Sequence, residues 1–196
     1  RYFSLDPSKK TILILGGSLG ARTINRTLTA GLDIIRQNPD IQFIWQTGKI
    51  YIDQVRDAIT TAVGEAVHHP HINAIPNMYV TDFIKDMANA YAAADLVISR
   101  AGAGSISEFC LLHKPVILVP SPNVAEAHQT KNALALVDKD AAIYVKDVEA
   151  QEKLLPVALA TVKDSDKLKE LSNNIAKLAL PDSATIIAKE VLKLIK

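Results

Sequence analysis

Short apolar runs separated by segments with helical spacing dominate the chain up to about residue 145. Thr11 to Leu15 is β-branched or apolar along its whole length and ends at Gly16-Gly17. Apolar residues at positions 24, 28, 32 and 35 then follow the spacing of one helix face. This pattern predicts a strand, a glycine turn and a helix, and Ile41 to Trp45 supplies the next predicted strand.

The same alternation continues along the chain. The further predicted strands are 73–75, 79–83, 96–99, 116–119 and 142–145. The further predicted helices are 51–62, 84–94, 105–112 and 125–137, and residues 147–196 are predicted to be wholly helical. Strands that are apolar along their length and alternate with helices indicate a parallel sheet covered on both faces. The predicted fold class is therefore α/β, a doubly wound parallel sheet with C-terminal helices.

Composition is that of one globular domain. The chain has 196 residues, of which 48% are hydrophobic and 22% charged, which excludes a disordered tail or a disulfide scaffold. Arg1 to Lys10 is polar and is predicted to be a residual linker, which leaves residues 11–196 as the domain. Cys110 is the only cysteine, so no internal disulfide can form, as fits a reducing compartment.

Charge and hydropathy exclude two further classes of protein. The formal net charge is +1, so no broad positive field exists to attract nucleic acid, and no nucleic-acid partner is expected. The apolar stretch from Leu111 to Pro122 is interrupted by His113, Lys114 and prolines, and it is shorter than the roughly 20 residues of a membrane-spanning helix. No spanning segment is expected, and the N-terminus lacks a signal-peptide core.

The first glycine turn, Gly16 to Arg22, is a candidate phosphate site. Missing β-carbons let the backbone approach an anion, and Ser18 offers a hydroxyl beside a helix N-terminus. A tight turn without a ligand is the alternative. The turn does not match the dinucleotide fingerprint G-x-G-x-x-G, because Ser18 and Ala21 stand where glycines are needed and Gln46, not an acid, ends the second strand.

The second glycine turn, Arg100 to Glu108, also follows a predicted strand. Backbone N–H groups of Ala103, Gly104 and Ser105 would point from a helix N-terminus toward a diphosphate. Glu108 lies one turn into that helix, and its carboxylate can accept hydrogen bonds from vicinal hydroxyls such as those of a ribose. The alternative is a capping-box glutamate paired with Ser105.

A third polar cluster begins the helix after the 116–119 strand. Its members are Glu126, His128, Gln129 and Asn132. Such side chains can bind sugar hydroxyls, and a solvated helix face is the alternative. Because ligands of open α/β sheets bind at the carboxyl ends of strands, the position of this cluster favours a ligand.

The clustered histidines and two aromatic residues are not assigned to a ligand site. His68, His69 and His71 lie within four residues of a predicted loop and cannot easily converge on one ion, so no metal is assigned. Trp45 and Tyr91 are interpreted as packing residues, since neither lies in a basic and aromatic pattern.

Four motifs together carry a family resemblance that covers the whole chain. They are Gly16 to Arg22, Thr81 to Met87, Arg100 to Glu108, and His128-Gln129 with Asn132-Ala133. In this order they resemble the C-terminal domain of the MurG-type UDP-N-acetylglucosamine transferases of peptidoglycan synthesis. The resemblance implies a Rossmann-like half of an inverting GT-B glycosyltransferase that uses no cofactor and no tightly bound metal.

The resemblance also implies which residues hold the sugar nucleotide. Ser18 and the backbone of Ala103 and Gly104 would bind the diphosphate, and Glu108 would bind the ribose hydroxyls. The backbone of Ile84 would read uracil. The remaining implied contacts are Phe83 and Met87 beside the base and His128, Gln129 and Asn132 at the N-acetylglucosamine.

The family's acceptor-binding N-terminal domain has no counterpart in this sequence. The resemblance therefore implies donor binding by this chain, with transfer to the undecaprenyl-pyrophosphoryl-muramyl-pentapeptide only through the missing domain and with no catalytic base assigned. It implies a peripheral position at the cytoplasmic face of the bacterial inner membrane for the intact enzyme and a soluble fragment. The open alternatives are a stand-alone transferase subunit with a membrane-bound partner, half of a UDP-sugar epimerase, and a non-catalytic nucleotide-binding module.

Overall fold

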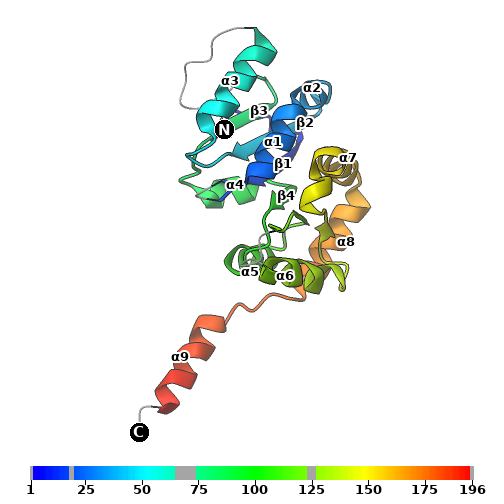
Figure 1. The fold of residues 1–196 in the computed structure, drawn as a ribbon. Helices are drawn as coiled ribbons and strands as arrows, with labels where there is room; N and C mark the ends of the chain where they lie inside the picture. The colour runs from blue at the N-terminus through cyan, green and yellow to red at the C-terminus, as the bar shows by residue number, and fades with distance from the viewer. Residues whose placement is uncertain (1, 18–19, 65–73, 123–126, 195–196) are drawn as a thin grey trace.

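One parallel sheet of six strands forms the centre of the molecule (Figure 1). The computed structural model describes residues 2–17, 20–64, 74–122 and 127–194. The strands are β1 Lys10–Leu15, β2 Ile41–Gln46, β3 Met78–Thr81, β4 Leu96–Ser99, β5 Val116–Leu118 and β6 Ile143–Tyr144. Their order in space is β3-β2-β1-β4-β5-β6, and all five pairings are parallel. The predicted doubly wound parallel sheet is confirmed.

Helices cover both faces of this sheet. They are α1 Arg22–Ala30, α2 Leu32–Arg36, α3 Ile52–Val63, α4 Met87–Ala93, α5 Ala103–Leu111, α6 Ala127–Val137, α7 Ala150–Lys163, α8 Ser165–Ala176 and α9 Ser183–Leu194, with a 3₁₀ turn at Asp147–Glu149 before α7. Buried residues of α1, α2, α3 and α7 form one core cluster, and those of α4, α5 and α6 form the other.

Strand β1 shows why the sequences of the central strands are apolar at every position rather than at alternate positions. Ile12 and Ile14 face the cluster beneath α1 and α7, whereas Leu13 and Leu15 face the cluster beneath α4 and α5. Since successive side chains of a strand point to opposite faces, a sheet covered on both faces buries all of them. Trp45 of β2 is fully buried as predicted, and its Nε1–H donates to Asn25 Oδ1 over 2.9 Å.

Several elements differ from the sequence prediction. No strand forms at the described residues 74 and 75 of the predicted 73–75 strand, which are bends, and the helix predicted from 105 begins at Ala103. The region 147–196, predicted to be wholly helical, is interrupted at Asp164 and at 177–182. Two further differences in helix boundaries involve particular side chains. The single helix predicted from positions 24 to 35 is divided at Gly31, where a β-carbon would lie 2.0 Å from Leu155 Cδ1 of α7. Helix α4 begins at Met87, three residues after the predicted Ile84, because the Asp86 side chain accepts the Asn89 N–H and caps the helix there. Capping by Asp86 therefore sets the start of α4, and the close approach of Leu155 leaves no room for a side chain at position 31.

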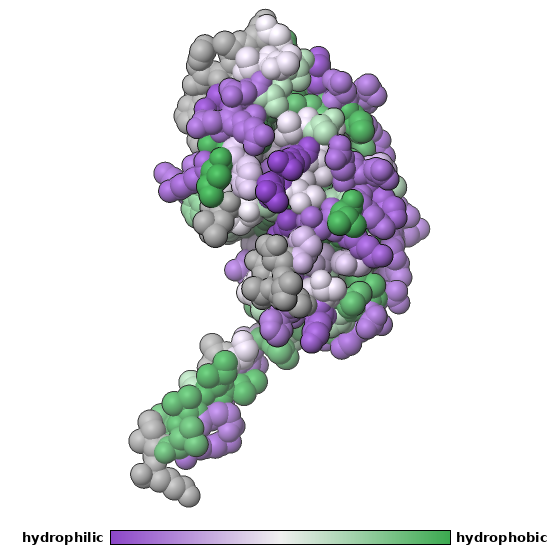
Figure 2. All heavy atoms as spheres, viewed as in Figure 1, coloured by the Kyte–Doolittle hydropathy of each residue, from purple (hydrophilic) through white to green (hydrophobic). Residues whose placement is uncertain are grey.

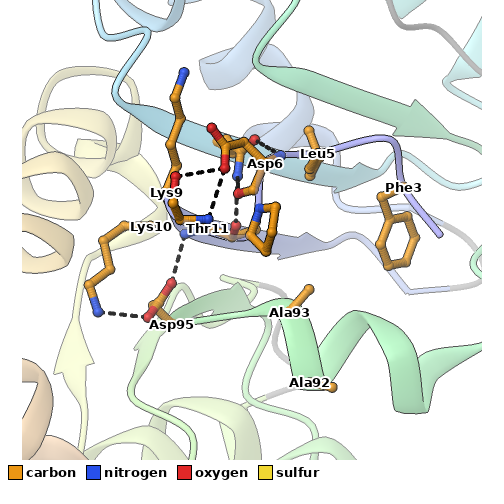
Figure 3. A pocket seen from close by; sticks show the side chains of 12 residues that line it. Phe3, Leu5, Asp6, Lys9, Lys10, Thr11, Ala92, Ala93 and Asp95 are labelled. Atoms are coloured by element: carbon orange, nitrogen blue, oxygen red, sulfur yellow. Dashed lines mark hydrogen bonds and ion pairs between the residues drawn. The ribbon is translucent and has the colours of Figure 1, made fainter. Parts of the chain in front are cut away.

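The segment before β1 lies against the amino end of the sheet (Figure 3). Phe3 is only 5% exposed, and its ring meets that of Tyr79 edge-on, with centroids 4.9 Å apart. The Asp6 N–H donates to Gln42 Oε1 of β2, and Gln42 Nε2–H donates back to the Asp6 carbonyl. Within the stretch that we predicted as a residual linker, residues 1–10, Phe3, Leu5 and the backbone of Asp6 thus contact the domain.

Helix α9 stands apart from the body of the molecule (Figures 1 and 2). Apolar side chains along it and just before it are exposed, namely Leu180, Ile186, Ile187, Val191, Leu192 and Leu194. Within the described ranges, no helix has both the length and the hydropathy needed to cross a membrane.

Candidate functional site

The two glycine turns meet at the carboxyl edge of the sheet. Leu15 at the end of β1 pairs in register with Ser99 at the end of β4, so the turns that follow these strands leave the sheet side by side. They share a cleft of about 220 Å³. It lies where the strand order reverses, the place where open α/β sheets bind ligands. From the turns, the lining residues are Gly16, Gly17, Arg100, Gly102 and Ser105.

The first turn has a backbone that depends on glycine. Gly17 and Gly20 have φ angles of +70° and +80°, and the Gly20 N–H donates to the Gly17 carbonyl over 3.2 Å. A β-carbon on Gly20 would lie 2.4 Å from the Tyr51 ring and 2.6 Å from the Thr47 carbonyl oxygen. Ser18, the predicted diphosphate ligand, lies outside the described residues.

The second turn leads into an open helix N-terminus. Among the residues that the structure describes, no side chain caps helix α5, and its first turn contains no acidic residue. Its first hydrogen bond runs from the Ile106 N–H to the Gly102 carbonyl, so the N–H groups of Ala103, Gly104 and Ser105 precede the helical ladder. Together with the helix dipole these donors favour an anion.

Glu108 reaches the cleft from the second turn of α5 and pairs with a tyrosine. The Tyr91 hydroxyl of α4 donates to Glu108 Oε2 over 2.8 Å, and both residues line the cleft. Burial, and then this hydrogen bond, raise the pKa of the Tyr91 phenol above its ordinary value. The capping-box alternative for Glu108 is not what the structure shows, since α5 begins at Ala103 and lacks a side-chain cap.

An ion pair that the sequence did not predict braces this edge of the sheet. The Arg100 guanidinium donates to Asp147 Oδ1 and to the Val119 carbonyl, and the Thr23 hydroxyl donates to Asp147 Oδ2. The pair therefore joins the loop after β4 to the first turn of α1. Asp147 follows β6, so its position after a strand was the signal that could have found it.

A second hollow of about 350 Å³ adjoins the first one. Arg100 and Gln129 line both of them, and the second is also lined by Gly20, Arg22, Thr23, Tyr51 and Asp147. The Gln129 side-chain oxygen accepts the Ser121 N–H over 3.2 Å, which ties α6 to the loop after β5. Two neighbouring hollows that share the lining residues Arg100 and Gln129 therefore lie at this edge of the sheet.

The structure brings together only part of the predicted ligand set. Met87, Glu108 and Gln129 line the first cleft. Phe83 is 48% exposed and the Ile84 side chain is buried in the core, and neither side chain lines a described cleft at this edge.

The remaining predicted residues that the structure describes are not among those that line the cleft. Ala103 and Gly104 are exposed at the start of α5, where the prediction concerns their backbone. His128 is exposed at the start of α6, and Asn132 Nδ2–H donates to the Ala101 carbonyl and so supports the second turn. Glu126 lies outside the described residues.

No metal-ligand cluster occurs among the residues that the structure places. No three His, Cys, Asp or Glu side chains converge there. The histidines at 68, 69 and 71 lie outside the described ranges.

Comparison with known proteins gives a consistent answer. The profile of the glycosyltransferase family 28 C-terminal domain matches residues 11–187. The UDP-N-acetylglucosamine–N-acetylmuramyl-(pentapeptide) pyrophosphoryl-undecaprenol N-acetylglucosamine transferases of Bacteroides fragilis and Bacteroides thetaiotaomicron are each 74% identical over 99% of this chain. These alignments cover 48% and 50% of the two relatives.

Among solved structures, the crystal structure of MurG from Acinetobacter baumannii matches with a TM-score of 0.77 and 28% identity. The match covers 95% of this chain and 52% of that protein. The chain therefore spans about half the length of the relatives it matches. The profile match over most of its length shows that this chain belongs to the glycosyltransferase family 28 C-terminal domains.

Proposed function

We propose that this chain binds UDP-N-acetylglucosamine as the donor half of a glycosyltransferase. The relatives are named for transfer of N-acetylglucosamine to the lipid-linked muramyl-pentapeptide, and this chain aligns with about half of their length. The other half of such an enzyme would bind that acceptor. The complete enzyme would work as a peripheral protein at the cytoplasmic face of the inner membrane, where a lipid-linked acceptor is presented.

The observation that carries the proposal is the shared cleft. Gly16 and Gly17 from one turn and Gly102 and Ser105 from the other line the same space, with Glu108 at its side. Two glycine turns at the ends of neighbouring strands allow backbone N–H groups to surround one pyrophosphate. A carboxylate beside them suits the ribose of the attached nucleoside.

The same geometry suits departure of UDP. As the bond to the anomeric carbon breaks, negative charge develops on the diphosphate. In the proposed complex, the open N-terminus of α5 would present its N–H groups and the positive end of its dipole to the diphosphate. Fixed donors of this kind stabilise a leaving group without reorganising during the reaction.

The rest of the donor would lie on either side of the diphosphate. Met87 lines the cleft on the α4 side, together with Tyr91, and we place the uracil there, next to the backbone of Ile84. Gln129 lines both hollows, so the sugar would extend past it toward the larger hollow. His128 and Asn132 are adjacent on α6 and complete the proposed sugar side.

Calorimetry with UDP and UDP-N-acetylglucosamine, without added metal, tests the proposal. Binding of both ligands is expected, and its absence at millimolar ligand contradicts the proposal. Glu108→Ala should weaken UDP at least tenfold, because hydrogen bonds to a charged group contribute about 1.5–3 kcal/mol. Inorganic diphosphate should be affected much less.

Glu170→Ala is the matched control, since Glu170 is an exposed glutamate of α8 that pairs with Lys167. It should leave the affinity for UDP unchanged. Equal weakening of UDP and diphosphate by Glu108→Ala would remove the ribose assignment.

A further inference from the structure

We infer that Tyr91 is a positioning residue that holds Glu108 ready for the ribose and makes the cleft select ribonucleotides over 2′-deoxyribonucleotides. The inference rests on the proposed function, because it requires a uridine nucleotide in the cleft. It gives Tyr91 a second role beside the packing role predicted from the sequence.

The Tyr91 ring is fixed by the core. The residue is 6% exposed and belongs to the buried cluster between the sheet, α4 and α5. Its ring packs edge-on against Phe109, with centroids 6.2 Å apart and an interplanar angle of 77°. Phe109 directly follows Glu108 in α5, so the ring of Tyr91 is anchored to the helix that carries the carboxylate.

The phenol is the polar end of this anchored ring, and it meets the cleft at Glu108. The hydroxyl donates to Glu108 Oε2 over 2.8 Å. Within the described part of the chain, Oε1 accepts no hydrogen bond from the protein. One carboxylate oxygen is therefore held by the protein while the other is left to accept a ligand hydroxyl.

This arrangement removes a cost of binding. A glutamate side chain that is free in solvent loses conformational entropy when a ligand orders it. The hydrogen bond from a rigid tyrosine orders Glu108 before the ligand arrives. The entropy cost of ordering the carboxylate then no longer reduces the binding free energy that the ribose hydroxyls contribute.

An ordered carboxylate also discriminates against ligands that lack a hydroxyl. A site built to bind a hydroxyl rejects the analogue without it, because the charged acceptor loses a partner. A mobile carboxylate can instead turn toward water and recover a hydrogen bond, so binding of the deoxy ligand costs it much less free energy. The preference for UDP over 2′-deoxy-UDP therefore reports whether Glu108 is held in place.

The test compares the dissociation constants of UDP and 2′-deoxy-UDP for the wild-type chain and for Tyr91→Phe by calorimetry. Loss of one hydrogen bond to the carboxylate should weaken UDP about fivefold. The affinity for 2′-deoxy-UDP should change less, so the ratio of the two constants falls toward one. Tyr79→Phe is the matched control, since Tyr79 is another buried tyrosine and does not line the cleft, and it should preserve the ratio.

Two further variants test the role of Tyr91 even if Tyr91→Phe disturbs folding. Glu108→Asp retains the charge at an exposed helix position but withdraws the carboxylate from the Tyr91 hydroxyl, so it should lower the ratio as Tyr91→Phe does. In a Glu108→Ala background, Tyr91→Phe should add no further loss of UDP affinity, because the carboxylate that it positions is gone.

The outcomes separate this inference from the proposed function. If the wild-type chain binds no UDP, both the proposed function and the inference about Tyr91 are wrong. If UDP binds normally but Tyr91→Phe leaves the ratio unchanged, or weakens both ligands equally, Tyr91 is only a brace between α4 and α5 and the inference alone is overturned.

Discussion

Removal of the Asp147 carboxylate should destabilise the fold far more than removal of other surface acids. Asp147 accepts hydrogen bonds from Arg100 and from the Thr23 hydroxyl, the latter over 2.8 Å. The Arg100 and Asp147 side chains are 20% and 13% exposed. Asp147→Ala removes the carboxylate partner of the Arg100 guanidinium, which keeps its hydrogen bond to the Val119 carbonyl, and removes the acceptor of the Thr23 hydroxyl.

The magnitude follows from the burial of this pair. Breaking a fully buried pair costs about 3–5 kcal/mol, whereas exposed pairs contribute about 0–1 kcal/mol. A pair that is mostly but not fully buried should lie between these limits, at about 2–3 kcal/mol. In a domain of this size each kcal/mol lowers Tm by about 2–4 °C, so a fall of about 5–10 °C is expected.

Thermal unfolding followed by circular dichroism measures this difference, and Glu149→Ala is the control. Glu149 is two residues away and pairs with Lys153 over 2.8 Å, but their side chains are 36% and 56% exposed. The control should lower Tm by about 1–2 °C. In 1 M NaCl the gap between the variants should persist, because screening acts mainly on exposed charges. Equal shifts in the two variants would refute this reasoning.

Three more expectations concern single features of the chain. Gly20→Ala should unfold at a clearly lower temperature, because its β-carbon would overlap Tyr51 at a positive φ, whereas Gly104→Ala meets nothing within 4 Å and should leave Tm unchanged or slightly higher. The pKa of Tyr91 is higher in the folded chain than in the unfolded chain, where it is about 10. The protonated phenol therefore stabilises the fold below a pH of about 10, and this stabilisation is lost as the pH rises from that pKa toward the pKa of the folded state. Alkaline unfolding should therefore be less steep in Tyr91→Phe than in the wild-type chain. Ending the chain after Ala179 should leave Tm within about 1 °C and raise solubility, since it removes the exposed apolar face of α9 while Ala179 still packs on the core.

The sheet could be predicted from the sequence because burial on both faces leaves a strong local signal. Ile12 to Leu15 are all apolar since each contacts one of the two cores, and the glycines after β1 and β4 mark where those strands end. The two turns could likewise be predicted to meet, because parallel strands end at one edge.

The contacts that complete the edge could not be predicted in this way. The pairs Tyr91 with Glu108 and Arg100 with Asp147 join residues 17 and 47 positions apart. In each pair, the sequence around one residue gives no indication of which residue it contacts. The need for glycine at position 31 is likewise not visible locally, since the side chain that a β-carbon there would meet is Leu155 of α7.

The contact between Gly31 and Leu155 has a consequence for synthesis of the chain. Helix α7 packs along α1, yet it is made about 120 residues later. At the usual elongation rate of about 5–20 residues per second, the ribosome needs roughly 6–25 seconds to deliver it. During that interval the nascent chain carries β1 and α1 with one apolar side uncovered. Chaperones that bind exposed apolar segments therefore have a defined target and a defined time in the folding of this domain.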